Sequence, residues 1–278
     1  MPNLGKQVSA SGPRRPGLRS WSAMARGLRV SDFEQPPSRF ATARTAVAGW
    51  LRDGIYAGGF LVGWRPADNE IRAAVARGAL WFPLLGAAGG ALVAQVLALL
   101  DLQQPELSAI VAVVLLVVLA GARPAVDFMR FFGGGLLGMV LLLGVLASEV
   151  WAFQALAGNL RVIALVLAPM LGRWAYVVQA YGSLPARPDG FAAMMVRHMQ
   201  FTQFATASVS AMALSLMLIN ALGTLVLFLV ASLTILLRIW THSRHGGVSA
   251  VSLGAGAFLC EALVVVLVGA VARLAAGG

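Results

Sequence analysis

The sequence is short of cysteine and of acidic residues. It has one cysteine, Cys260, and 11 Asp and Glu residues in 278. One cysteine excludes an internal disulfide and a cysteine metal cluster, and we expect Cys260 to pack as a small apolar side chain. The acidic residues that follow Glu106 are Asp127, Glu149, Asp189 and Glu261. A site that needs several carboxylates must therefore draw on very few side chains.

Charge of either sign is also scarce. Only 12% of the residues are charged and 59% are hydrophobic, which excludes an ordinary soluble domain and indicates a polytopic membrane protein. The sequence contains no phosphate-binding P-loop, no dinucleotide fingerprint and no serine-hydrolase motif. The common soluble nucleotide-binding and hydrolase classes are therefore excluded.

Apolar runs dominate the chain after residue 78. A spanning helix needs about 20 apolar residues, and we expect seven spans, which makes the fold an all-α polytopic integral membrane helical bundle. The expected spans are 79–100, 107–122, 131–154, 161–182, 202–220, 222–240 and 251–275. Two glycine pairs, Gly86 with Gly90 and Gly134 with Gly138, have the spacing that lets helices approach closely.

The basic residues gather before the spans, in a leader over residues 1–43 and a segment over 44–78. Twelve of the 21 Lys and Arg residues precede residue 78. We expect the leader to stay on the cytoplasmic side of a bacterial-type inner membrane, next to anionic lipid, and not to bind nucleic acid. It lacks the apolar core of a signal peptide. With seven spans, Arg123, Arg130, Arg187, Arg197 and Arg244 fall inside and the carboxyl terminus outside.

Residues 44–64 are apolar but are interrupted by Arg52 and Asp53. Two charges at mid-depth would be costly, so we expect an interfacial, amphipathic segment over 44–78 and not an eighth span. The transmembrane bundle is then expected over 79–278.

Several segments resemble the cobalamin synthase family in the same order. They are "FLVGW" (60–64), "ARGALWFPLLGAAGGAL" (76–92), "APMLGRWAYVVQAYGSLPARPDGF" (168–191) and "RHGGVSAVSLGAGAFLCEAL" (244–263). That family consists of membrane enzymes that join adenosylcobinamide-GDP to alpha-ribazole or its phosphate. The resemblance covers about residues 45–278 and implies a cobalamin-synthase-like bundle.

The resemblance weakens where the family carries its acidic residues. The family has a segment of the form "HEDGLADTADG", whose aspartates are thought to hold a divalent metal, followed by "EIMRDSRIGTYG". Here "VDFMRFFGGGLLG" (126–138) matches the second piece, with Asp127 and Arg130, and the first piece is missing. The aspartate of the family's "TGD" falls on Val251, whereas Glu261 is retained.

The resemblance nominates Asp127, Arg130, Arg173 and Glu261 as candidate catalytic residues. A rebuilt Mg²⁺ site would need Asp127, Asp189 and Glu261, because one carboxylate is a poor magnesium site. We otherwise expect no cofactor. Arg173 lies in mid-span, where it either meets a substrate phosphate or pairs with Glu261.

Two further groups of polar residues have a structural explanation as an alternative to a functional one. Glu149 is an intramembrane carboxylate, for which pairing with Arg173 or Arg161, or protonation in the bundle, is favoured over a functional role. His242 and His245 have a spacing that metal sites use, but no third ligand is evident. A cationic loop that orients the protein is favoured there.

Two functions follow from these observations. The favoured one is a non-catalytic member of the family that serves as a scaffold or accessory subunit, with a protein partner in a larger membrane complex. The alternative is an active adenosylcobinamide-GDP ribazoletransferase with a rearranged metal site. A transporter is a weaker third hypothesis, because the sequence shows no inverted repeat.

Overall fold

The computed structural model describes residues 39–64 and 66–277, so most of the predicted leader lies outside the described residues. The chain divides into two compact units, Met1–Ala46 and Val47–Gly278, and the description below concerns the second. Its helices, with α2 beginning in the first unit, are α2 (Arg39–Leu61), α3 (Asn69–Arg77), α4 (Phe82–Leu100), α5 (Pro105–Leu119), α6 (Arg123–Phe131), α7 (Gly135–Gln154), α8 (Gly158–Ala180), α9 (Phe191–His198), α10 (Phe201–His245) and α11 (Ala250–Gly277). A short 3-10 turn, Gly78–Trp81, leads into α4.

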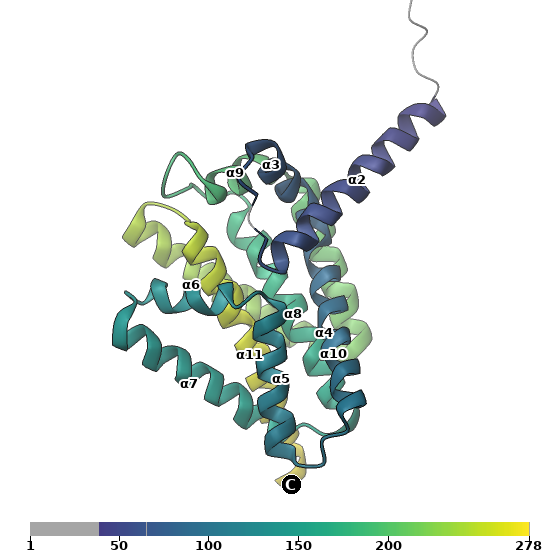
Figure 1. Ribbon diagram of the computed structural model, residues 1–278, viewed down its shortest axis with the longest axis vertical. Helices are drawn as coiled ribbons and strands as arrows, with labels where there is room; N and C mark the ends of the chain where they lie inside the picture. The colour runs from purple at the N-terminus through teal and green to yellow at the C-terminus, as the bar shows by residue number, and fades with distance from the viewer. Residues whose placement is uncertain (1–38, 65, 278) are drawn as a thin grey trace, which may run out of the picture. The chain divides into compact units, whose positions relative to one another are not determined.

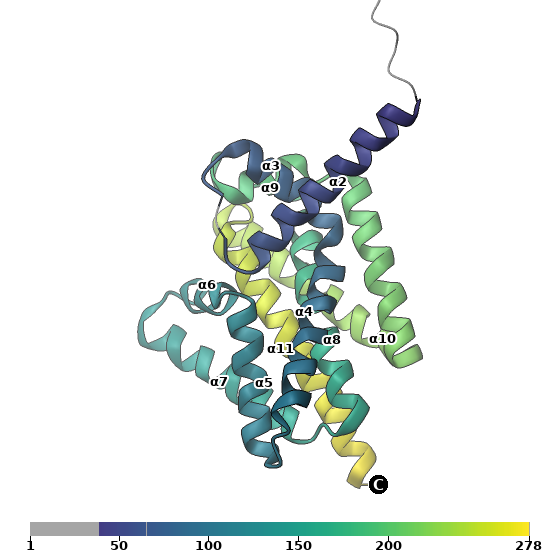
Figure 2. The same cartoon turned by 45° about the vertical axis from the view of Figure 1, so that its right-hand side comes forward.

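The helices form an all-α bundle in which α8 is central (Figures 1 and 2). α8 packs against α4, α10 and α11, and almost every residue of its second half is buried. The short helices α3 and α9 pack together at one end of the bundle, and α11 runs from that end to the other. The described residues contain no strand, only an isolated bridge between Pro185 and Val248.

The expected count of seven spans is not confirmed. Five of the described helices are long and apolar enough to cross a membrane, or six if the bent pair α5 and α6 is one span. The predicted second span, 107–122, is the 15-residue helix α5, after which the chain turns by 88° into α6. The predicted multi-pass membrane protein is thus confirmed, whereas the count of seven is not.

The long helix α10 is interrupted where the sequence predicts a boundary between two spans. Ile219 and Asn220 leave the helical conformation, and Asn220 has a positive φ of 50°. A Cβ at Gly223 would lie 2.6 Å from the backbone carbon of Ser215, so the two arms, 201–218 and 221–245, meet closely at the turn. Glycine is required there because a side chain would hold the arms apart.

The tightest helix packing joins α4 to α8. A Cβ at Gly86 would lie 2.9 Å from the Cα of Met170, and one at Gly90 would lie 2.8 Å from the Cα of Val166. Pro169 lies inside α8 and has no N–H, so it cannot donate to the carbonyl of Leu165, the carbonyl that faces Gly90. The glycines therefore let α4 contact α8 backbone to backbone, as their spacing predicts.

The second glycine pair behaves differently. Gly138 contacts the backbone of Met129 in α6, but a Cβ at Gly134 would meet nothing within 4 Å. Gly134 instead has a φ of 67° and, with Gly133 and Gly135, forms a turn of three positive-φ glycines. The close-packing prediction is wrong for Gly134, because this glycine serves the turn before α7 and not a helix interface.

The predicted junction at 123–130 is a helix. Pro124 lies in the first turn of α6, and the preceding Ala122 adopts a φ of 56° that turns the chain out of α5. Phe128 of α6 packs on Phe258 of α11, with ring centroids 5.3 Å apart. The sequence indicates only a short junction between the second and third expected spans, because nine residues with three charges do not resemble a span. Membrane orientation and the interfacial placement of 44–78 stay predictions.

We expect Gly90→Val to lower the free energy of unfolding by about 3 kcal/mol, because the added side chain must push α4 away from α8. Gly144→Val in α7 is the matched control, since a Cβ there meets nothing within 4 Å. Chemical unfolding in mild detergent measures both. Equal stability of the two variants would contradict the close contact.

Candidate functional site

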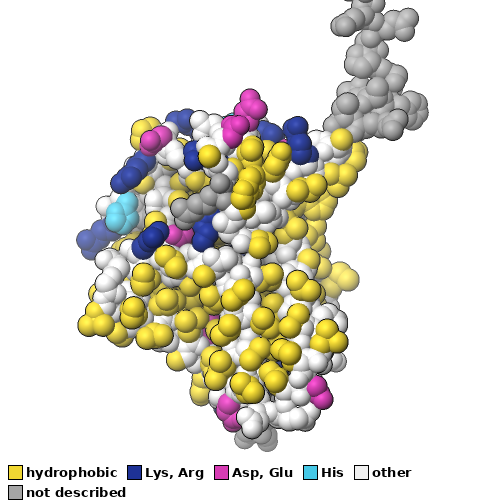
Figure 3. Space-filling view, viewed as in Figure 1, with side chains coloured by type: hydrophobic (Ala, Val, Ile, Leu, Met, Phe, Trp, Pro, Cys, Tyr) yellow, Lys and Arg dark blue, Asp and Glu magenta, His cyan; other side chains and the backbone are white. Residues whose placement is uncertain are grey.

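A pocket of about 300 Å³ lies at the end of the bundle that carries α3, α6 and α9. We call it the arginine pocket. It is lined by Phe60, Pro66, Arg72, Arg123, Asp127, Arg130, Phe191, Ala250 and Val251. Figure 3 shows that Lys and Arg side chains gather at this end, while hydrophobic side chains cover the flank over α5 and α7. The pocket is therefore cationic, with three arginines and one aspartate in its lining.

Two of the arginines are held by backbone carbonyls. Arg72 donates from Nε to the carbonyl of Pro66 at 3.0 Å and from a terminal nitrogen to Oδ1 of Asn69 at 3.2 Å. Arg123 donates to the carbonyl of Gly63 at 3.4 Å, and its guanidinium lies 5.5 Å from the ring centroid of Phe60. The Arg72 guanidinium has more N–H groups than these two acceptors use, so it can also donate to a ligand.

The carboxylate of the pocket is Asp127. Its side chain is buried, and a Cβ built on Gly254 of α11 would lie 2.8 Å from the Cβ of Asp127. Gly254 is thus required for α6 and α11 to approach at this point. Arg123, Asp127 and Arg130 follow each other at spacings of four and three residues, so they lie on one face of α6.

The amino terminus of α11 completes the pocket. Ser249 and Ser252 cap this helix reciprocally: the backbone N–H of Ser249 donates to Oγ of Ser252 at 2.8 Å, and the N–H of Ser252 donates to Oγ of Ser249 at 3.1 Å. The first two helical residues, Ala250 and Val251, line the pocket. A helix amino terminus carries a partial positive charge and N–H groups, which favour an anion.

The pocket therefore suits a phosphorylated ligand. Three arginines face one carboxylate, and a helix amino terminus adds to the positive potential. Guanidinium groups bind phosphate oxygens through paired N–H donors, so this set suits a diphosphate, and the Asp127 carboxylate lines the same pocket.

The residues present do not fit a magnesium ion held by carboxylates. Among the described residues there is no group of three or more His, Cys, Asp or Glu side chains placed to hold a metal. Asp189 is exposed in the loop before α9 and does not line the arginine pocket. Glu261 lines a different, much smaller cavity, so the structure does not bring Asp127, Asp189 and Glu261 together.

Glu261 lies beside Glu149 and Arg173 inside the bundle. Glu149 and Glu261 line the same cavity of about 10 Å³, and the Glu261 carboxyl interacts electrostatically with Arg173. A Cβ on Gly172 would lie 3.3 Å from Oε2 of Glu261. Arg161 is engaged elsewhere, because it donates to Oγ of Ser108 at 2.8 Å and to the carbonyl of Leu156 at 2.9 Å.

His242 is used to fix a loop. Its Nδ1 lies 2.8 Å from the carbonyl of Arg238, and the N–H of Leu184 lies 3.1 Å from its Nε2. A neutral ring with the proton on Nδ1 satisfies both contacts. Both ring nitrogens of His242 therefore have partners within the chain, and the cationic-loop hypothesis stays a prediction.

The sequence indicates Asp127 and Arg130 as candidate site residues. It relates Arg123 only to membrane orientation and indicates no role for Arg72. The sequence signal for Arg123 is its spacing from Asp127 and Arg130. If residues 123–131 form a helix, these three side chains lie on one face of it. Arg72 reaches the pocket from α3 by a tertiary contact, which the sequence does not contain.

We expect pyrophosphate to raise the Tm of the detergent-solubilised chain, because a ligand that binds the folded state stabilises it. Arg130→Gln should weaken the apparent affinity about tenfold through loss of a charge-assisted hydrogen bond. Arg244→Gln, an exposed arginine that does not line the pocket, should change nothing. If both variants bind pyrophosphate with the same apparent affinity, the anion does not bind in the arginine pocket.

Comparison with known proteins matches the second half of the chain, which includes Arg130 and the start of α11. The profile of the family described as Cobalamin-5-phosphate synthase matches residues 129–269. A curated protein named adenosylcobinamide-GDP ribazoletransferase, from Roseiflexus sp. (strain RS-1), is 37% identical over 140 residues, which is 50% of this chain and 51% of that protein. The chain spans about half the length of the curated relative that it matches. No solved structure matches. The profile covers half of the chain, and the chain belongs to the cobalamin-5-phosphate synthase family.

Proposed function

We propose that this chain is an adenosylcobinamide-GDP ribazoletransferase, which joins adenosylcobinamide-GDP to alpha-ribazole or its phosphate and releases GMP. The observation that carries the proposal is the arginine pocket, where three arginines, a helix amino terminus and one carboxylate converge. Family membership and the name of the Roseiflexus relative support it.

The arginines bind the diphosphate in this proposal. Arg72 and Arg123 line the pocket and are anchored by backbone carbonyls, which fixes their positive charges beside the ligand. Arg130 is exposed at the end of the same face of α6. As the phosphorus–oxygen bond to GMP breaks, negative charge grows on the leaving phosphate, and fixed guanidinium groups stabilise that charge.

Asp127 acts as the general base. A ribose hydroxyl of alpha-ribazole attacks the phosphorus attached to cobinamide, a new phosphorus–oxygen bond forms, and the bond to GMP breaks. The proton of the hydroxyl passes to the Asp127 carboxylate and then to water, and GMP leaves with the electron pair of the broken bond. No step is assigned to a metal, because the pocket contributes a single carboxylate.

The second candidate is the non-catalytic scaffold or accessory subunit. The single carboxylate of the pocket favours it, because the family segment that is missing here carries several aspartates. It requires a protein partner, so the chain should co-purify with another protein from mild detergent. A lone species would remove its main support.

The deciding assay incubates the purified full chain with adenosylcobinamide-GDP, alpha-ribazole phosphate and Mg²⁺ and measures GMP. We expect GMP release that falls about 100-fold or more in Asp127→Asn, because a general base contributes on that order. Arg244→Gln should retain the wild-type rate. If the chain releases no more GMP than a protein-free control, the transferase proposal is wrong and the accessory-subunit proposal remains.

A further inference from the structure

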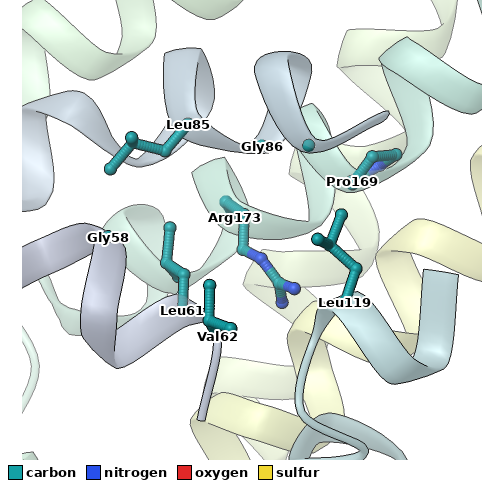
Figure 4. Close-up of a pocket in the computed structure, with 9 residues that line it drawn as sticks. Gly58, Leu61, Val62, Leu85, Gly86, Leu119, Pro169 and Arg173 are labelled. Atoms are coloured by element: carbon teal, nitrogen blue, oxygen red, sulfur yellow. The ribbon is translucent and has the colours of Figure 1, made fainter. Parts of the chain in front are cut away.

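A second cavity, of about 100 Å³, lies between α2, α4, α5 and α8. Its walls are almost entirely apolar. They are formed by Gly58, Leu61, Val62, Leu85, Gly86, Gly89, Leu119 and Pro169, and the remaining lining residue is Arg173. Figure 4 shows the Arg173 side chain leaving α8 and extending between Leu61 and Val62 on one side and Leu119 on the other. We call this the Arg173 cavity.

Arg173 has five N–H donors and little protein to satisfy them. The residue is only 5% exposed. Among the residues that the structure describes, none accepts a hydrogen bond from its guanidinium, and its electrostatic partner Glu261 lines a different cavity. A buried arginine that faces an apolar cavity without acceptors is costly, so an acceptor-rich group in the cavity would stabilise it strongly.

The cavity has room for such a group and a route to it. A volume of about 100 Å³ holds several groups of the size of water. Val62, which follows α2 and lines the cavity, is 61% exposed, so this part of the lining lies at the molecular surface. In a membrane-embedded bundle, molecules with an apolar part have direct access to that surface.

The Arg173 cavity is separate from the arginine pocket. The two have no lining residue in common. A void of about 10 Å³, lined by both Arg123 and Arg173, lies between them and is too small for a ligand to pass. A ligand of the Arg173 cavity therefore occupies a different site from a ligand of the arginine pocket.

We propose that the Arg173 cavity binds a phosphate ester that carries an apolar group, with the phosphate on the Arg173 guanidinium and the apolar group against Leu61, Leu85 and Leu119. A charged phosphate alone satisfies the arginine but leaves the apolar walls uncovered. An apolar molecule alone leaves the guanidinium without an acceptor. Only a ligand with both parts matches the lining, and either a phospholipid or a soluble ester supplies this chemistry.

Two substitutions test the site without touching the arginine pocket. A Cβ on Gly58 would lie 3.9 Å from Leu85, an ordinary contact, so Gly58→Leu fills the cavity from within α2. Gly49→Leu is the matched control on the same helix, since a Cβ there meets nothing within 4 Å. Arg173→Gln removes the charge and tests the guanidinium directly.

The experiment measures the Tm of the full chain in two arms. In the first arm, delipidated protein in detergent receives phenyl phosphate or inorganic phosphate. In the second arm, the chain is placed in nanodiscs of phosphatidylcholine alone or mixed with phosphatidylglycerol. We expect phenyl phosphate, phosphatidylglycerol or both to raise the Tm by roughly 2–5 °C over the matched control. The arm that responds identifies the soluble or the lipid source.

The rise in Tm caused by the ligand should disappear in Gly58→Leu and in Arg173→Gln, and it should persist in Gly49→Leu. Gly58→Leu should also keep the wild-type response to pyrophosphate, which shows that the variant is folded and that the arginine pocket is intact. A Tm that does not rise in either arm, or an increment that survives in Gly58→Leu, overturns the proposal.

Discussion

The close contact of α4 with α8 is the constraint on which the rest of the bundle depends. Gly86 and Gly90 bring the backbone of α4 against the turn of α8 that contains Pro169. In a membrane, helices gain little from burying apolar side chains, so backbone approach and van der Waals contact must hold them together. α8 contacts α10 and α11 on its other sides, and these helices bring the loops of the arginine pocket into place.

The charges of the bundle are divided between two environments. At the α3, α6 and α9 end, arginines outnumber carboxylates and reach a pocket of ligand size. Inside the bundle, Glu149, Glu261 and Arg173 are buried from lipid. Charges at such depth persist only where they find partners or serve a ligand. The opposite end carries Arg161 and Arg273, and both donate to backbone carbonyls, so these two arginines have a structural role.

Much of the fold could be predicted from the sequence, because apolar length and glycine spacing are local signals. The all-α membrane bundle, the break near residue 220 and the Gly86 and Gly90 contact follow from them. The helix α6 could not be predicted in the same way. It has nine residues and three charges, and its stability comes from packing on α11 through Phe128 and Asp127. The arginine pocket depends on α6, so it was visible from the sequence only in the residues Asp127 and Arg130.

The turn at Ile219 and Asn220 has a consequence for how the pocket is assembled. A helical excursion that reverses direction once returns the chain to the face from which it started. α10 makes that excursion between α9 and α11, so Phe191 and Ala250 line the same pocket although α10 separates them in the sequence. If the arms of α10 were joined into one straight helix, the amino terminus of α11 would lie on the opposite face. The reversal within α10 thus helps to bring α9 and the start of α11 to one pocket, although no residue of α10 lines that pocket.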